Sequence, residues 1–200
     1  MVKNQEPAER CLGCGLAVAG GTAGCQSIMD ELLARDFSDV TYFRVHRLLV
    51  DTYCVQHPES YCVSFKSLAA HLVGLCWSLE HGGSRAVPSE ALRRWVERHS
   101  KLEKPELPTF RGRLTIADVS KASDAEAHGR AVEDWARSTW EAYSALHLLV
   151  RHWVQLGLDD ERRSDGPSKA NLPPVNTRLK PMRPPLSKSS RRRARLRRNR

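Results

Sequence analysis

The chain has 200 residues, of which 40% are hydrophobic, and a net charge of +9. This length allows one domain of ordinary size, and the apolar residues up to Leu158 are numerous enough for a sizeable core. The charge is uneven, because residues 161–200 carry 14 Lys/Arg against 2 Asp/Glu, a net of +12 that leaves −3 for residues 1–160. The basic charge therefore belongs to the C-terminal segment alone. It does not exclude basic partners or substrates for the mildly acidic body of the chain.

The sequence offers no segment suited to a membrane. The first residues lack the apolar core of a signal peptide, and nowhere do 18 uninterrupted apolar residues occur. We therefore expect a soluble, cytoplasmic chain with no membrane partner. In that reducing compartment the six cysteines should be free thiols, so a Cys-x-x-Cys pair indicates a metal or redox site rather than a disulfide framework.

Helical periodicity dominates the chain after a short N-terminal segment. The run Cys11-Leu-Gly-Cys14-Gly15 and the loose Gly/Ala segment at 19–24 predict a knuckle, a tight turn that presents two thiols. Five helices are then predicted, at residues 25–36, 40–57, 64–79, 89–99 and 124–156. Ser38-Asp39 separates the first two, Pro58 ends the second and Gly82-Gly83 closes the third.

Two connecting segments have weaker patterns. Residues 101–112 contain Pro105 and Pro108 without periodicity, which predicts an extended surface loop. Residues 114–119 fit either one short strand or one helical turn, and the sequence does not decide between them. Taken together, the elements predict an all-α fold: a bundle of about five helices with an N-terminal Cys-rich knuckle, forming one domain over residues 1–160.

Residues 161–200 are predicted to be a disordered Pro/Arg-rich tail. They hold six prolines and few large apolar residues, so they cannot bury enough surface to offset chain entropy. Seven arginines in the last ten residues favour non-specific nucleic-acid binding through phosphates, but no aromatic side chains are interleaved for base stacking. A solvated extension without a function explains the same composition, and the sequence predicts no oligomeric state.

The thiols at the N-terminus form the first candidate site. Cys11 and Cys14 have the spacing that lets two sulfurs reach one tetrahedral ion, and Cys25 follows at the start of the first helix. If the first two helices run antiparallel, the end of the second helix brings His57 next to Cys25. We therefore predict a zinc site formed by Cys11, Cys14, Cys25 and His57, whereas His46 lies roughly 16 Å further along its helix and is too far away.

Two other readings of these residues stay open. The cysteines can be small hydrophobic residues, with His57 a helix-end histidine that bonds the last carbonyls. Alternatively, Cys11 and Cys14 form a redox pair, although such pairs usually start a helix and a glycine-rich segment follows here. A single Cys-x-x-Cys does not separate these readings decisively.

A second candidate site lies in the middle of the predicted bundle. His46 and Tyr53 share one face of the second helix, and antiparallel packing would bring His71 and His128 near them. These four side chains would line a pocket that binds a second metal or acts as an acid/base site. The reading we favour is that each histidine is a neutral core residue with one satisfied hydrogen bond. Asp51 falls on the opposite face, one turn after Arg47, which predicts a surface ion pair.

Several motifs resemble an uncharacterised family of bacterial helical proteins, a domain of unknown function. They are Cys11-x-x-Cys14-Gly15, Gly24-Cys25, Val45-His46-Arg-Leu-x-Val-Asp51-x-Tyr53-x-x-Gln56-His57-Pro58 and Trp135-Ala-x-Ser-x-Trp140-Glu. The resemblance extends from Cys11 to about Trp153 and does not include the tail. It implies that the family's motif positions are Cys11, Cys14, Cys25, His46, Asp51, Gln56 and His57, and it implies no activity, substrate or metal.

The leading functional hypothesis is a non-enzymatic protein in which a structural zinc ties the knuckle to the helix pair, with an interaction or regulatory role. The competing hypothesis is an enzyme whose mid-bundle pocket is lined by His46, Tyr53, His71 and His128. A third is a nucleic-acid-associated protein that uses the arginine-rich tail. Whether the four mid-bundle residues converge on an open cavity discriminates between the first two hypotheses.

Overall fold

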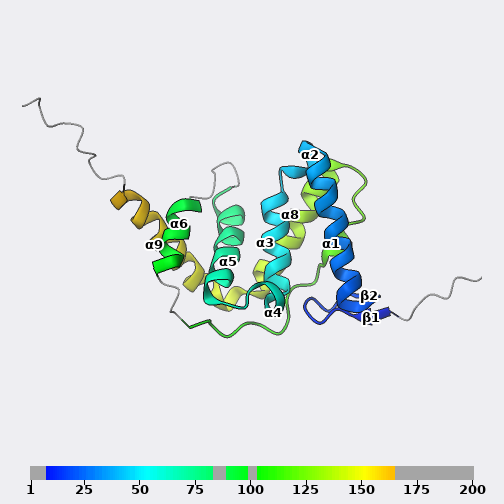
Figure 1. Cartoon of the computed structure of the whole chain (residues 1–200), viewed down its shortest axis with the longest axis horizontal. Helices are drawn as coiled ribbons and strands as arrows, with labels where there is room; N and C mark the ends of the chain where they lie inside the picture. The colour runs from blue at the N-terminus through cyan, green and yellow to red at the C-terminus, as the bar shows by residue number, and fades with distance from the viewer. Residues whose placement is uncertain (1–7, 83–88, 99–102, 165–200) are drawn as a thin grey trace, which may run out of the picture. The chain divides into compact units, whose positions relative to one another are not determined.

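Figure 1 shows the chain as a computed structural model, which describes residues 8–82, 89–98 and 103–164. Within these residues the secondary structure is helical apart from one small antiparallel sheet. The predicted all-α bundle is therefore confirmed. No helix in the described part of the chain is both long and apolar enough to cross a bilayer. The tail was predicted to be disordered over residues 161–200. Its residues beyond Ser164 lie outside the described part of the chain.

A short hairpin begins the fold. Strand β1 (Ala8–Arg10) pairs antiparallel with β2 (Ala17–Ala19), and helix α1 (Gly21–Ser38) follows at once. The loose segment predicted at 19–24 is thus wrong, because these residues end a strand and start a helix. A Cβ atom on Gly24 would lie 2.0 Å from the carbonyl oxygen of Ala19, so this glycine lets the helix start against the strand.

The helix predicted at 40–57 is divided in two. Helix α2 (Val40–Phe43) is capped by Asp39, whose side chain accepts a hydrogen bond from the Thr41 amide. Val45 has φ −107° and ψ 6°, which interrupts the helix before α3 (His46–Gln56) begins. Helix α3 ends before Pro58, as predicted, and this proline occupies the first turn of α4 (Pro58–Tyr61).

The remaining elements follow the predicted order with one further division. They are α5 (Phe65–Glu80), α6 (Ser89–Arg98), α7 (Ile116–Val119), α8 (Ala125–Ala142), the 3-10 turn η1 (Ser144–Leu146) and α9 (His147–Ser164). The undecided segment at 114–119 is therefore a helical turn, and the last predicted helix is split at η1. Helix α9 continues past residue 160, where the sequence analysis placed the end of the domain.

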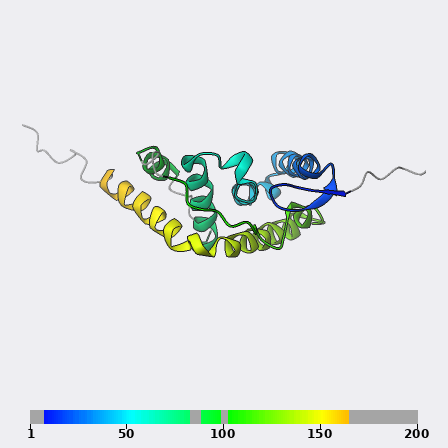
Figure 2. The same cartoon turned by 90° about the horizontal axis from the view of Figure 1, so that it is seen from below.

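Helices α8 and α9 follow one another along one side of the other helices (Figure 2). Helix α8 packs against α3, and α9 packs against α5 and α6. The C-terminal half of α3 is enclosed on all sides, since every residue from Asp51 to Pro58 is buried. The polar side chains on this half must therefore find partners inside the protein.

Candidate metal centre

The loop between β1 and β2 turns so that two thiols face the same point. The amide of Cys11 donates to the carbonyl of Leu16 at 2.8 Å, and the amide of Gly15 donates to the carbonyl of Cys11 at 2.9 Å. Gly15 has φ 76°, a conformation that favours glycine and that closes the turn directly after Cys14. The backbone of Leu16 also hydrogen-bonds the Cys14 thiol. This turn is the predicted knuckle.

The other two members of the site come from helix ends. Cys25 lies in the second turn of α1 and is fully buried, and His57 is the residue that ends α3. The Nδ1 atom of His57 lies 2.7 Å from the carbonyl oxygen of Tyr53. A carbonyl only accepts hydrogen bonds, so Nδ1 carries the proton and Nε2 presents a lone pair.

The four predicted side chains converge. The Nε2 atom of His57 lies 3.4 Å from the sulfur of Cys11 and 3.4 Å from that of Cys25, and the sulfurs of Cys14 and Cys25 are 3.7 Å apart. All four ligand atoms lie within 4.8 Å of one another, so the cluster could hold a metal ion. Around a tetrahedral zinc ion, two sulfurs would be about 3.8 Å apart and a sulfur and a nitrogen about 3.5 Å apart. The three distances of 3.4, 3.4 and 3.7 Å fit this geometry.

Gly13 lets the knuckle lie directly on the histidine ring. A Cβ atom at this position would lie 2.3 Å from Cδ2 of His57 and 3.2 Å from the carbonyl oxygen of Gln56. Any other residue would therefore push the loop away from α3. The sequence predicted a tight turn at this glycine but not its contact with His57, which depends on a helix far away in the chain.

The electrostatics of the cluster favour ionisation of one thiol, Cys14, while Cys25 keeps its proton. A hydrogen bond with Cys25 lowers the pKa of Cys14 to about 4, although burial acts against this. The same hydrogen bond and burial raise the pKa of Cys25. Burial alone would lower the pKa of His57, but hydrogen bonds with Cys14 and with the Tyr53 carbonyl raise it. Sulfurs this close cannot all be ionised unless positive charge compensates them, and a bound dication supplies that charge.

Three polar side chains, Tyr53, Gln26 and Tyr61, form a hydrogen-bonded group beside the cluster. The Tyr53 ring stacks on His57 with centroids 4.0 Å apart, and its hydroxyl lies 3.9 Å from the sulfur of Cys25 and 3.2 Å from Oε1 of Gln26. The Tyr61 hydroxyl donates to the same Gln26 oxygen. Burial raises the pKa of Tyr53, so its phenol stays protonated and can donate to a thiolate. Tyr53 thus belongs to this centre rather than to a mid-bundle pocket.

Of the three histidines predicted to join Tyr53, two are hydrogen-bonded to different carboxylates, and the third, His128, is hydrogen-bonded to Arg35 with Nη2 and Nδ1 2.6 Å apart. The Nδ1 atom of His46 lies 3.1 Å from Oδ2 of Asp36, and Nε2 of His128 lies 3.5 Å from Oδ1 of the same residue. The Nδ1 atom of His71 lies 2.8 Å from Oδ1 of Asp51. The predicted set of four is therefore divided into three groups in the described structure, because the imidazoles bond partners that were not predicted for them: Asp36, Arg35, and Asp51, which was predicted to lie on the surface.

Asp51 corrects a second prediction. Its ion pair with Arg47 is present, with Nε and Oδ2 2.6 Å apart, but the carboxylate is fully buried instead of lying on the surface. Helix α5 covers the face of α3 that was expected to meet water, and it supplies His71 as the second partner. Burial opposes the protonation of His71, but hydrogen bonds with Asp51 and Cys54 outweigh it and raise the pKa of His71 to about 9.

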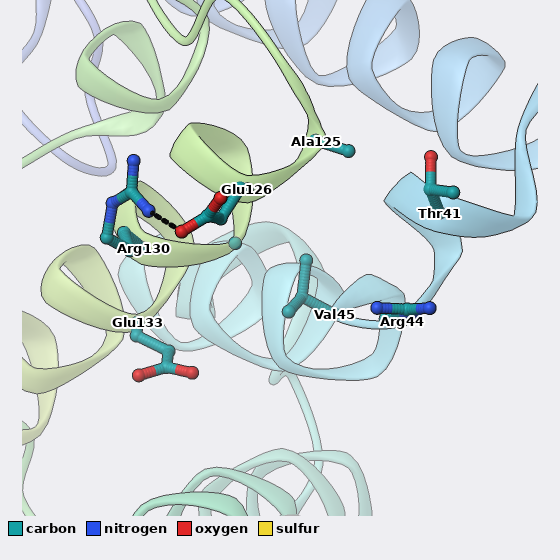
Figure 3. A pocket seen from close by; sticks show the side chains of 8 residues that line it. Thr41, Arg44, Val45, Ala125, Glu126, Arg130 and Glu133 are labelled. Carbon is teal, nitrogen blue, oxygen red and sulfur yellow. Dashed lines mark hydrogen bonds and ion pairs between the residues drawn. The ribbon is translucent and has the colours of Figure 1, made fainter.

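A surface pocket of about 550 Å³ lies between the α2–α3 junction and α8. Figure 3 shows Thr41 and Arg44 on one side of it and Glu126 and Arg130, an ion pair, on the other. The lining residues are Thr41, Arg44, Val45, Ala125, Glu126, Gly129, Arg130 and Glu133. None of the four residues predicted for a catalytic pocket lines this one.

The fold and the cluster together define a helical protein whose N-terminal hairpin and first helix carry three cysteines toward a histidine, a set that could hold a metal ion. The chain belongs to a family of unknown function, DUF5946, whose model matches residues 9–144. The match includes all four residues of the cluster. No curated protein and no solved structure matches the chain.

Proposed function

We propose that this protein binds one zinc ion through Cys11, Cys14, Cys25 and His57, and that the ion has a structural role. The observation that carries the proposal is the convergence of four ligand atoms within 4.8 Å of one another. They come from three places, the knuckle, the start of α1 and the end of α3. The ion would therefore join the hairpin and α1 to α3.

The donor set favours zinc. Three thiolates and one imidazole at tetrahedral spacing suit zinc, whereas calcium, magnesium and manganese prefer oxygen ligands. Four protein ligands also fill all four coordination positions, which is typical of structural sites, because catalytic sites keep one position for water or substrate. The Nδ1 hydrogen bond from His57 to a backbone carbonyl is the outer contact that most zinc-bound histidines make.

We further propose an interaction or regulatory role for the helical body rather than catalysis. The three histidines that would serve an enzyme each have a hydrogen-bond partner, since His46 and His71 bond buried carboxylates and His128 bonds Arg35. In contrast, Phe37 and Val40 are 70% and 79% exposed, and Phe43 lies beside them with its ring 5.6 Å from that of Phe37. Exposed apolar groups of this kind often mark a surface for a partner.

Zinc-thiolate ligands must be reduced to bind, which supports the cytoplasm as the compartment. All six cysteines are free thiols in this structure. Binding of nucleic acid through the arginine-rich tail and the domain boundary at residue 160 stay predictions from composition.

Elemental analysis of purified protein tests the proposal, and we expect close to one zinc per chain. Cys25→Ser should lose the zinc, whereas Cys76→Ser should retain it. The two cysteines are matched, because both are fully buried within helices and only Cys25 faces the cluster. A chelator should lower the melting temperature of the wild type and of Cys76→Ser only. Metal-free protein that has the same melting temperature as the zinc-loaded form would contradict the proposal.

A further inference from the structure

The four ligands differ in how far solvent reaches them. Cys11, Cys25 and His57 are 2%, 0% and 3% exposed, whereas Cys14 is half-buried at the tip of the knuckle. Its sulfur lies 3.7 Å from that of Cys25. A small oxidant that approaches from solvent therefore meets Cys14 first. The buried thiol of Cys25 is next to it.

We infer that this centre is a peroxide-responsive site, in which Cys14 and Cys25 form a disulfide and the zinc leaves. This inference rests on the proposed zinc site and adds a regulation to it. The reacting partner is a hydroperoxide, the class of oxidant small enough to reach a half-buried sulfur. The two electrons come from the two thiolates, and the zinc ion stays divalent throughout.

The reaction has two steps. The Cys14 sulfur attacks one peroxide oxygen, so that an S–O bond forms, the O–O bond breaks and the departing hydroxide takes a proton from solvent to become water. The Cys25 sulfur then attacks the Cys14 sulfur, so that the S–S bond forms, the S–O bond breaks and a second hydroxide leaves and is protonated. Two thiolates, one peroxide and two protons give one disulfide and two waters.

The structure indicates what this bond would change. Zinc connects three segments, the knuckle, α1 and α3, whereas a Cys14–Cys25 disulfide connects only the knuckle and α1. With two of its four ligands oxidised, the ion is left with Cys11 and His57 and dissociates. The link to α3 is then lost, and a thiol reductant together with zinc restores it.

The test treats zinc-loaded full-length protein with hydrogen peroxide and follows zinc release with a coloured chelator. Peptide mapping by mass spectrometry then identifies the oxidised cysteines. We expect one zinc released per chain, a Cys14–Cys25 disulfide at least about tenfold more abundant than any other pair, and reversal by dithiothreitol plus zinc. Cys54, Cys62 and Cys76 serve as internal controls, because they are buried away from the cluster and should remain thiols.

Three other outcomes would contradict the inference, the assigned cysteine pair or the proposed zinc site. Zinc that stays bound while peroxide oxidises other cysteines overturns the inference and leaves the zinc site intact. A Cys11–Cys14 disulfide overturns the assigned pair. Untreated protein without zinc overturns the proposed function, and the inference with it. The variant Cys76→Ala should release zinc at the wild-type rate, and a slower release would mean that the oxidant acts through the core rather than at the knuckle.

Discussion

His57 is oriented by its surroundings before any ion binds. The Tyr53 carbonyl fixes the proton on Nδ1, the Tyr53 ring packs on one face of the imidazole and the knuckle backbone covers its edge at Gly13. Holding a ligand in one rotamer and one tautomer reduces the entropy that metal binding would otherwise cost. The contacts around His57 should therefore raise the affinity of the proposed site for its ion.

Gly13→Ala tests this packing. The added methyl would lie 2.3 Å from the His57 ring, so the knuckle must move away and the four ligands can no longer meet at one point. We expect zinc affinity, measured by competition with a chelator, to fall by about ten- to a hundredfold. Gly129→Ala is the control, since its Cβ meets no atom closer than 4.0 Å and should leave the affinity unchanged. Equal affinities in both variants would contradict the packing argument.

The pair of His71 and Asp51 predicts a pH dependence of stability. The pKa of His71 in the folded protein is about 9, above the usual 6.5 of histidine, so protonated His71 stabilises the fold. Its contribution is fully present below pH 6.5 and is lost as the pH rises through about 9. By linkage it amounts to at most about 3 kcal/mol.

Urea unfolding of the wild type and of His71→Gln at a series of pH values measures this contribution. The difference in unfolding free energy between the two should be largest near pH 6 and should shrink by about 2–3 kcal/mol by about pH 9.5. Taking the difference cancels the pH dependence of metal binding, which is common to both proteins. His152→Gln, at an exposed position, should follow the wild type throughout. A difference that does not vary with pH would refute the assignment.

At the residue scale, the sequence predicted what depends on spacing and not what depends on packing. Cys11, Cys14 and Cys25 are close in the chain, and Pro58 fixes the helix end at which His57 lies, so their meeting followed from local geometry. Asp51 was predicted to lie on the surface and no role was predicted for Asp36, because their burial depends on α5 and α8, which are far away in the sequence. The favoured reading, one hydrogen bond for each histidine, therefore named no partner, and the competing reading placed the three imidazoles in one pocket.

Among the elements, α3 is joined to α8 in part by hydrogen bonds of one buried side chain, that of Gln56. The amide nitrogen of Gln56 donates to the carbonyls of Arg111 and Leu114 and to the Thr139 hydroxyl, at 2.9, 2.9 and 3.1 Å. Its oxygen accepts a hydrogen bond from the Trp135 indole at 3.0 Å. Gln56 thus fixes both the loop before α7 and the face of α8, one residue before the histidine of the metal centre.

Gln56→Leu should cost about 3 kcal/mol or more in unfolding free energy, because several buried polar groups lose their partner at once. Guanidinium melts of zinc-loaded protein would measure this loss. Gln155→Leu, on the exposed side of α9, should change the stability by less than about 0.5 kcal/mol. With Trp135→Phe, which removes the indole donor, the loss from Gln56→Leu should be smaller than in the wild type. Fully additive losses would mean that the two side chains act independently.

The helix breaks show where sequence patterns stop predicting elements. Hydrophobic spacing continues through residues 40–57 and 124–156, so each range was predicted as one helix. The breaks at Val45 and at Tyr143 are turns of the backbone without proline or glycine. At the second break, the Tyr143 hydroxyl donates to the Val55 carbonyl of α3 at 2.7 Å, a contact between distant parts of the chain. The hydrophobic pattern predicts which residues are buried, but it does not predict where the helix axis bends.

For the whole molecule, the candidate metal centre lies in one part of the buried core, and a group of packed aromatic rings lies in another. Phe65 and Trp153 pack edge to face with centroids 5.2 Å apart, and Trp95 lies 6.1 Å from Trp153, which joins α5, α6 and α9 without any ligand of the cluster. The hairpin, in contrast, has two strands of three residues, too short to be stable alone. The hairpin should therefore depend on zinc more than the rest of the fold does.

Hydrogen exchange measured by mass spectrometry, on zinc-loaded and on chelator-treated protein, tests this division. Removing zinc should greatly increase exchange in β1, β2, the first turns of α1 and the last turn of α3, because these segments lose the point that joins them. Exchange in α5 and α9 should change little, since their buried aromatic contacts do not involve the ion. An equal increase in every helix would show that zinc stabilises the fold globally, and no change in the hairpin would show that its attachment does not depend on the metal.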